Sequence, residues 1–218
     1  ARLLHPFIPR CYGTHTHMGR TYTVLSDVCG EHEHPCICNI RLCGETGQDG
    51  GISTGGMSVV GYRKYSAKSA EYQVLDWREK TRKKQQLESM MEEFYAPPES
   101  ELGLGMVFPQ IERLQSLRDK LIRIIARADV VLGAEVDVLL TYDGEDRDVG
   151  GNVWMADFDG FHVIQRGGIG GGAEVVKAAE AADQNNEMLL QNLNELIDVL
   201  KSIEIKLRKR AHSLLLNR

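Results

Sequence analysis

The most regular hydrophobic pattern lies near the C-terminal end of the chain. Between Val175 and Leu214 apolar residues recur at alternating steps of three and four, interrupted at Asn186 and Arg210. Such spacing places side chains on one face of a helix, so a single long helix over residues 175–214 is predicted. Its stripe could dock on a helix of another subunit, or on a helix of this chain. We expect the first, because a rod of about 60 Å exceeds what a small domain needs.

Two further helices are predicted upstream. A strongly amphipathic one is expected over residues 109–132, with its apolar face formed by Leu114, Leu117, Leu121, Ile124, Ala128 and Val131. A middle helix is expected from Ser66 to Tyr95, where Pro97 and Pro98 stop it. Its centre is polar on every side, so only its ends are expected to be buried. The linker 97–108 would join the two helices.

Short strand patterns separate these helical segments. Residues 21–25, 57–62 and 136–142 have β-type composition, and the acidic segment with Asp143, Glu145, Asp146 and Asp148 follows the last of them as a turn. Residues 153–164 are typical of a β-hairpin, because Asp159-Gly160 accepts the backbone angles of a tight turn. Glycine-rich residues 44–56 have few side chains that could build a core, and they are expected to form a mobile loop or arm.

Together these patterns predict a mostly helical α+β protein. Its long C-terminal coiled-coil-type helix would form a helical hairpin with a small β element at the turn. The expected divisions are a Cys/His/Gly-rich module of loops and short strands over 1–62, the middle helix over 63–96, the linker 97–108 and the helical hairpin over 109–218.

Composition narrows the classes of function. The formal net charge of −5 gives no general attraction to phosphate backbones, so nucleic acid is an unexpected partner. Basic residues 78–84 would be scattered around a helix and are interpreted as a solvated face. No apolar run is long enough to span a membrane, and no secretory signal is evident. We therefore expect a soluble intracellular protein, or a virion component if the source is viral.

The densest chemical cluster lies in the N-terminal zone, which holds all five cysteines. Thiolates and imidazoles are the ligands that zinc prefers, and residues two apart in a strand point to the same side. The pattern predicts a structural zinc site, although its spacing differs from that of zinc ribbons and fingers; buried thiols with surface histidines are the alternative. The candidate ligands are Cys29, Cys36, Cys38 and Cys43, with His32 and His34 beside them.

Two other motifs resemble known sites over a few residues only. His15-Thr16-His17 resembles the His-x-His that opens metal-dependent amidohydrolase barrels, which implies a metal that activates water. Such a barrel needs further ligands at later strand ends, and beyond the Cys/His-rich N-terminal zone the chain has only His162 and His212. Residues 168–173 resemble the dinucleotide fingerprint, but the required second strand is replaced by a continuous helix, so the glycines are interpreted as a hinge.

No intact catalytic motif emerges, so the sequence predicts a non-enzymatic structural or assembly subunit of a virus particle or a similar machine. It would dock through its C-terminal helix on other protein subunits, including copies of itself, and not on a membrane. The first alternative is a zinc-containing nucleic-acid-binding adaptor that uses residues 1–62 and 78–84. The second is a metal-dependent hydrolase that uses His15 and His17.

Overall fold

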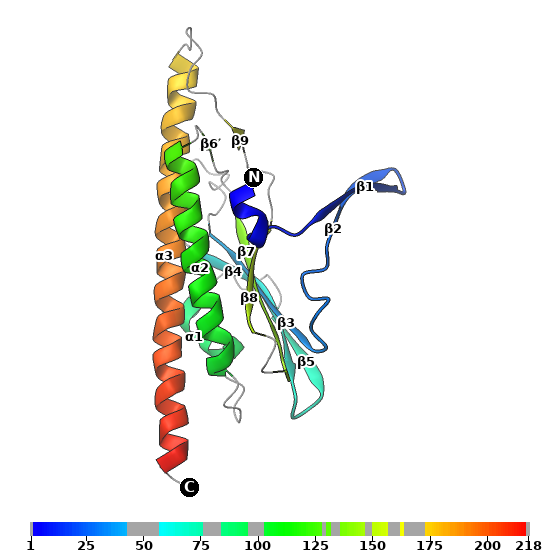
Figure 1. Cartoon of the computed structure of the whole chain (residues 1–218), viewed down its shortest axis with the longest axis vertical. Coiled ribbons are helices and arrows are strands. Elements are labelled where there is room, and N and C mark those ends of the chain that lie inside the picture. The colour runs from blue at the N-terminus through cyan, green and yellow to red at the C-terminus, as the bar shows by residue number, and fades with distance from the viewer. Residues whose placement is uncertain are drawn as a thin grey trace.

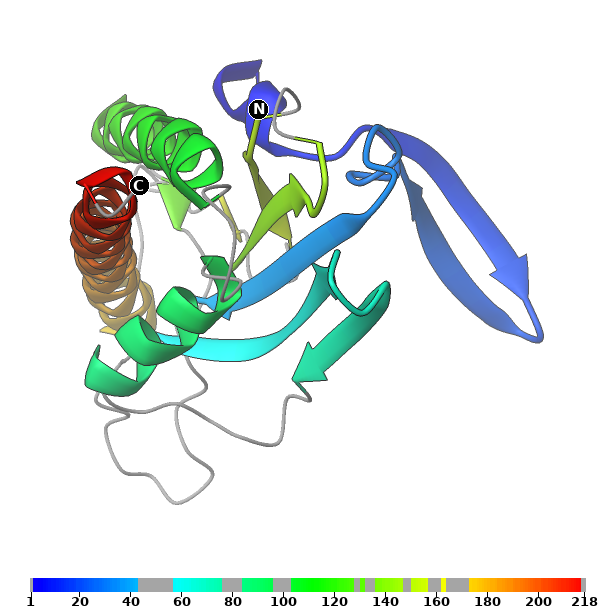
Figure 2. The same ribbon diagram turned by 90° about the horizontal axis from the view of Figure 1, so that it is seen from below.

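A computed structural model describes residues 2–42, 57–75, 84–95, 103–127, 130–131, 136–146, 150–156, 162–163 and 173–216. Three layers of elements are apparent in Figures 1 and 2: helices, a central sheet, and a projecting hairpin. The chain begins with the 3₁₀ helix η1 (Arg2–Phe7) and ends in the long helix α3 (Ala173–Leu216).

The central sheet has five strands in the order β5-β4-β3-β7-β8, and all neighbours are antiparallel. Their bounds are β3 (Pro35–Arg41), β4 (Ser58–Ser66), β5 (Glu71–Leu75), β7 (Asp137–Asp143) and β8 (Asn152–Ala156). β3 is the middle strand, and it alternates between half-buried and fully buried residues. This alternation gives the sheet two different faces.

One face of the sheet forms the core together with three helices. These are α1 (Lys84–Tyr95), α2 (Gly103–Arg127) and α3, and Figure 2 shows all three on the same side of the sheet. The sheet contributes fully buried residues such as Cys38, Ile40 and Leu140, which pack with Leu114 of α2 and Leu196 of α3. Because apolar surface is removed from water on both layers, this interface is the main source of stability in the fold.

A second β element projects from the other side. The strands β1 (Cys11–His17) and β2 (Arg20–Leu25) form a hairpin whose residues are all exposed. Met18 and Gly19 form its tip with φ angles of 49° and 73°, as a two-residue turn between twisted strands requires. A small third sheet pairs β6 (Val130–Val131) with β9 (His162–Val163).

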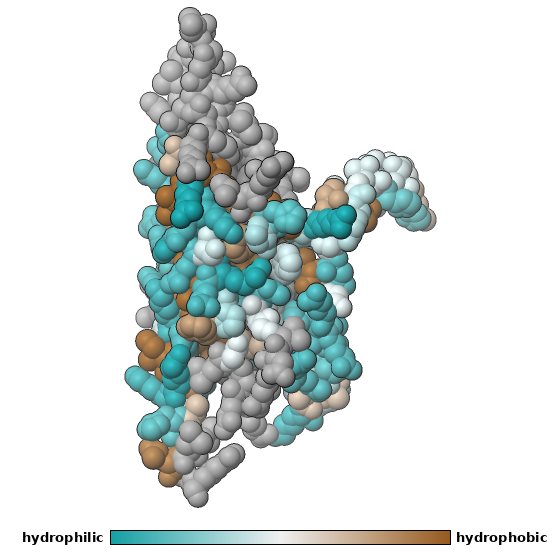
Figure 3. Space-filling view, in the orientation of Figure 1, coloured by the Kyte–Doolittle hydropathy of each residue, from teal (hydrophilic) through white to brown (hydrophobic). Residues whose placement is uncertain are grey.

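The prediction of a mostly helical protein with a coiled-coil-type helix is wrong, because a five-stranded sheet forms the centre of the molecule. The long helix exists, but the middle of its stripe, from Leu189 to Leu207, is buried inside this chain against α2, α1 and the sheet. The alternative in which the stripe packs within the same chain is therefore the observed one. Figure 3 shows apolar groups only in scattered positions over the described parts of α2 and α3.

Two local predictions also fail. Residues 66–75, expected to begin the middle helix, contain the end of β4, a turn and β5, and helix begins only at Lys84. The turn places Ala70 at a φ of 52°, which a helix does not allow. The expected hairpin over 153–164 is not formed either, since β8 pairs with β7 whereas β9 pairs with β6; its turn, Asp159-Gly160, lies outside the described residues.

Among the described residues, no helix is both long and apolar enough to traverse a lipid bilayer.

Candidate functional site

The face of the sheet that points away from the helices carries most of the polar side chains of the central strands. Directly paired residues of antiparallel strands point to the same side, so the register defines rows across this face. One row joins Asn39, Leu139 and Trp154, and the next joins Arg41, Asp137 and Ala156. We call this surface, together with the neighbouring row Ile37, Thr141 and Asn152, the polar face.

An ion pair at the end of three strands dominates the polar face. Arg41 Nε donates a hydrogen bond to Asp137 Oδ1 over 2.9 Å, and Arg41 Nη2 approaches Oδ2 at 3.5 Å. Asn39 Nδ2 donates to the same carboxylate over 3.1 Å. The Asp137 side chain is 5% exposed and that of Arg41 is 27% exposed, so the pair is largely shielded from water. A shielded pair of this kind holds both groups in fixed orientations.

Three buried side-chain atoms on the polar face have no hydrogen-bond partner among the described residues. They are Asn39 Oδ1, Thr141 Oγ1 and Trp154 Nε1. Buried polar groups are nearly always paired, because leaving one unpaired forfeits its hydration without replacement. An acceptor, a hydroxyl and a ring N–H gathered on one surface therefore indicate a place where a polar ligand could be held.

The opposite end of β7 is organised by Asp143, which lies in the predicted acidic turn. Its carboxylate accepts hydrogen bonds from the backbone N–H groups of Glu145, Asp146 and His34 over 2.9 to 3.0 Å. Burial alone would raise the pKa of Asp143, but these hydrogen bonds to its charged form lower it. The carboxylate thus fixes the turn beside the polar face and is already engaged by protein donors.

The predicted zinc ligands are dispersed over different environments. Cys36 and Cys38 point into the core, where Cys36 Sγ accepts a hydrogen bond from the Tyr65 backbone over 3.2 Å. Burial raises the pKa of both thiols, and burial together with Asp27 raises the pKa of Cys29 to about 11. Raised pKa values favour protonated thiols, whereas zinc requires thiolates.

The two candidate histidines are also engaged elsewhere or isolated. His34 stacks on Tyr65 with ring centroids 4.1 Å apart, and its Nε2 lies 3.5 Å from Glu145. His32 is buried, and its Nδ1 has no partner among the described residues. No group of three His, Cys, Asp or Glu side chains that could hold a metal occurs in the part of the chain that is described. The prediction of zinc as a structural cofactor is therefore wrong. Because Cys43 lies outside the described residues, the six candidate ligands as a set are not tested and stay a prediction.

The remaining motifs of the sequence give no second site. His15 and His17 lie on the exposed hairpin with ring centroids 6.5 Å apart, and no barrel surrounds them. The glycine-rich segments 44–56 and 168–172, most of the basic cluster 78–84, and Asp148 lie outside the described residues. Sequence reasoning missed Arg41 and Asp137; the only local signal was the alternation of Asn39 and Arg41 with apolar neighbours in a strand-like run.

No protein-family model matches this sequence, and no curated protein matches it. Its fold, however, is similar to that of solved inositol phosphate multikinases. One inositol phosphate multikinase, the subject of structural studies and protein engineering, has 15% identity and a TM-score of 0.64, and the match covers 93% of this chain and 92% of that one. Another, from S. cerevisiae and in complex with ADP and Mn2+, has 15% identity, a TM-score of 0.61 and coverage of 91% and 89%.

The likeness in fold overturns several of our expectations. A chain that shares nearly its whole architecture with kinases is not the non-enzymatic structural subunit of a virus particle that we predicted. That prediction depended on the long helix being a docking rod, and in the structure this helix closes the core. The alternatives of a zinc-containing nucleic-acid adaptor and of a metal-dependent hydrolase are not supported either. Both depend on a metal site, and no group of three side chains that could hold a metal occurs among the described residues.

Proposed function

We propose that this chain is a kinase that transfers a phosphoryl group from a nucleoside triphosphate to an inositol phosphate, with the polar face as part of its active site. The observation that carries the proposal is the likeness in fold over more than nine-tenths of the chain to an inositol phosphate multikinase. A related structure in complex with ADP and Mn2+ supports a nucleotide as the donor.

The polar face offers groups that suit such a reaction. Arg41 supplies positive charge that would attract phosphate oxygens. Asp137 orients it, and Asn39 in turn donates a hydrogen bond to Asp137. The unpaired Trp154 N–H can donate to a ligand, the unpaired Asn39 oxygen can accept, and the Thr141 hydroxyl can do either. Phosphoryl transfer depends mainly on positioning and on stabilising charge, so fixed polar groups of this kind are the protein's expected contribution.

A divalent cation is a further expectation for a kinase, because metal ions bridge the phosphates of the nucleotide. The described residues do not fit this role by themselves. Asp137 is the only carboxylate on the rows of the polar face, and it already accepts hydrogen bonds from Arg41 and Asn39. The polar face therefore lacks a carboxylate available to a cation among its described residues. Asp157 follows Ala156 in the sequence and is the next carboxylate to examine by substitution.

The test is an assay of phosphoryl transfer. The purified chain is incubated with radiolabelled ATP, Mg2+ or Mn2+ and a panel of inositol phosphates, and the products are separated by anion exchange. We expect a labelled product that depends on the protein. Arg41→Met should lower kcat/KM by at least about tenfold, which corresponds to about 1.4 kcal/mol of lost transition-state stabilisation.

A matched control is available on a helix. Arg208 lies on α3, is exposed and forms an ion pair with Glu204 at 2.6 Å, so it is the same residue type in an ion pair away from the polar face. Arg208→Met should leave kcat/KM within about twofold of the original value. Absence of transfer to every inositol phosphate with either cation would refute the proposal. An equal loss of kcat/KM in both arginine variants would show that the polar face is not part of the active site.

A further inference from the structure

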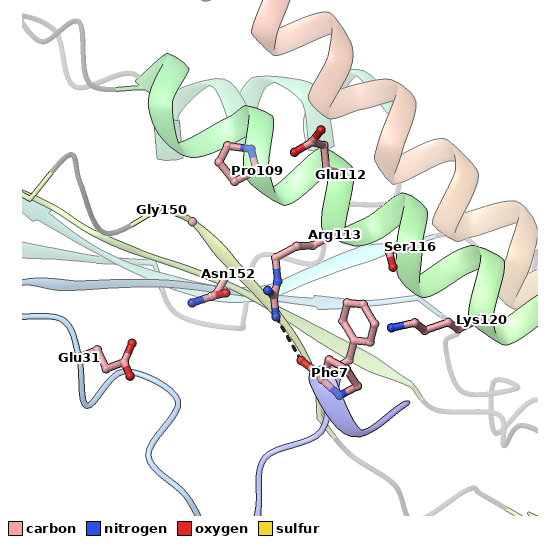
Figure 4. Close-up of a pocket in the computed structure, with 11 residues that line it drawn as sticks. Phe7, Glu31, Pro109, Glu112, Arg113, Ser116, Lys120, Gly150 and Asn152 are labelled. Atoms are coloured by element: carbon pink, nitrogen blue, oxygen red, sulfur yellow. Dashed lines mark hydrogen bonds between the residues drawn. The ribbon is translucent and has the colours of Figure 1, made fainter. Parts of the chain in front are cut away.

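A pocket at the free edge of the sheet lies apart from the ion pair of the polar face. It is bounded by η1, the exposed side of α2, the start of β8 and the loop that carries Glu31, and its volume is about 780 Å³. Figure 4 shows Arg113, Ser116 and Lys120 of α2 extending toward Phe7, with Asn152 and Glu31 on the opposite side. These three α2 residues share one helix face, because they follow one another at steps of three and four.

Two cationic side chains of the pocket converge on one buried ring. The guanidinium of Arg113 lies 5.6 Å from the centroid of Phe7, and Lys120 Nζ lies 4.7 Å from the same centroid. Arg113 is further held by a hydrogen bond of 3.1 Å from Nη2 to the carbonyl oxygen of Pro6. The aromatic ring therefore keeps both positive groups near each other instead of letting them separate in water.

Neither cation is held in a direct ion pair by a carboxylate within the described ranges, although Glu31 and Glu112 also line the pocket. Arg113 Nε is buried and has no hydrogen-bond partner among the described residues. Burial also lowers the pKa of Arg113, which is the direction expected for a cation that has lost hydration. An anion in the pocket would compensate both groups, and a phosphate can accept from an arginine and a lysine together.

The rest of the pocket lining has a different character. Across from α2, Glu31 supplies acceptors and Asn152 can donate or accept, and α2 itself adds the carboxylate of Glu112 and the hydroxyl of Ser116. A purely anionic ligand would be repelled by these carboxylates. Hydroxyl groups would be bound by them, because an ionised carboxylate accepts hydrogen bonds from hydroxyl donors. The two walls together match a molecule that has phosphate at one end and hydroxyls at the other.

We infer that this pocket is a second ligand site, which binds the phosphate ester of a small polyol with the phosphate between Arg113 and Lys120 and the hydroxyls toward Glu31 and Asn152. It shares Asn152 with the polar face but lies away from the ion pair of Arg41 and Asp137, and the inference does not depend on the chain being a kinase. The ligand would bridge η1, α2 and the edge strand β8, and so it would stabilise their packing.

The test is isothermal titration calorimetry of the full chain with glycerol 3-phosphate as the probe. Saturable binding is expected, with glycerol and inorganic phosphate each at least fivefold weaker than the ester. Lys120→Met should weaken binding of the ester at least fivefold. Lys120 makes no hydrogen bond among the described residues, so this variant is expected to fold, and circular dichroism checks it. Lys209→Met, which removes an exposed lysine of α3 that does not line the pocket, is the matched control and should bind normally.

Two further variants separate this site from the polar face. Glu31→Gln should weaken binding of the ester more than binding of inorganic phosphate, because only the ester has alcohol hydroxyls that can donate to Glu31. Arg41→Met should leave binding of the ester unchanged. The inference is overturned if no saturable binding occurs, if Lys120→Met binds as tightly as the original chain, or if inorganic phosphate binds as tightly as the ester. Loss of binding in Arg41→Met with retention in Lys120→Met would assign the ligand to the polar face instead.

Discussion

Replacing Asp137 by alanine should reveal how strongly the ion pair on the polar face is coupled. The substitution removes a carboxylate that is 5% exposed and leaves Arg41 and the Asn39 amide without their shared acceptor. Hydrogen bonds to buried charges contribute about 1.5 to 3 kcal/mol each, but Arg41 is 27% exposed and water can replace part of its loss. We therefore expect Asp137→Ala to lower the free energy of unfolding by about 3 kcal/mol.

The double substitution distinguishes a coupled pair from two independent groups. Arg41→Met alone leaves the buried Asp137 charge with the Asn39 amide and should cost about 2 to 3 kcal/mol. The Asp137→Ala, Arg41→Met variant should cost about 3 kcal/mol, so the coupling energy would be about 2 to 3 kcal/mol. Urea denaturation followed by circular dichroism and by tryptophan fluorescence measures all three, and Trp154 lies in the neighbouring row. If the two single costs simply add within about 0.5 kcal/mol, the reasoning about this pair fails.

Three other outcomes are expected. Gln110→Leu should cost about 3 kcal/mol in chemical denaturation, because the Tyr95 hydroxyl and the carbonyls of Thr141 and Asn152 lose their partner; an unchanged midpoint would contradict this. Burial raises the pKa of Asp143, but backbone hydrogen bonds to the carboxylate lower it by more, so the net pKa lies below the ordinary value of 3.8. The ionised carboxylate therefore stabilises the fold above pH 3.8, and this stabilisation is lost as the pH falls below that value. Unfolding midpoints measured across acid pH should show this loss in the original chain but not in Asp143→Asn. In alkylation at pH 8 followed by peptide mass spectrometry, Cys11 should react before Cys29, because Cys11 is exposed whereas the pKa of Cys29 is raised to about 11; equal rates would contradict the burial of Cys29.

The sequence located elements whose signal is local. The periodicity predicted helix over 175–214 and 109–132, and the structure has α3 at Ala173–Leu216 and α2 at Gly103–Arg127. A strand predicted over 136–142 appears as β7, Asp137–Asp143. In these segments the spacing of apolar residues within a dozen positions is sufficient, because each element buries one continuous stripe.

Elements that depend on distant partners were not predictable in the same way. Residues 66–75 contain alanines and mixed apolar positions that suit a helix, but β4 and β5 pair across a turn and Tyr65 contacts Tyr72. Packing against sheet neighbours overrides weak helix propensity in such a segment. The long helix was found, yet its partner was assigned to another chain, because periodicity shows that a stripe is buried but not by what.

The polar face shows the same limit for function. Asp137 lies 96 residues after Arg41 in the sequence, and only the register of β3 and β7 brings them together. Cysteines and histidines crowded within a short stretch suggested a metal site instead. In the fold, successive side chains of β3 point to opposite faces of the sheet. Cys36 and Cys38 therefore lie in the core, whereas Asn39 and Arg41 lie on the polar face, although the four residues are close in sequence.

The central position of β3 has a consequence for how the molecule is made. One edge of this strand pairs with β4, which follows soon after it in the sequence. The other edge stays unpaired until β7 is synthesised, which happens only after α1 and α2. During that interval a nascent chain would expose a row of unsatisfied backbone donors and acceptors, which is a template for intermolecular pairing. A translation product that terminates after α2 should therefore accumulate as insoluble aggregates, whereas in one that extends through β8 the free edge of β3 can pair with β7.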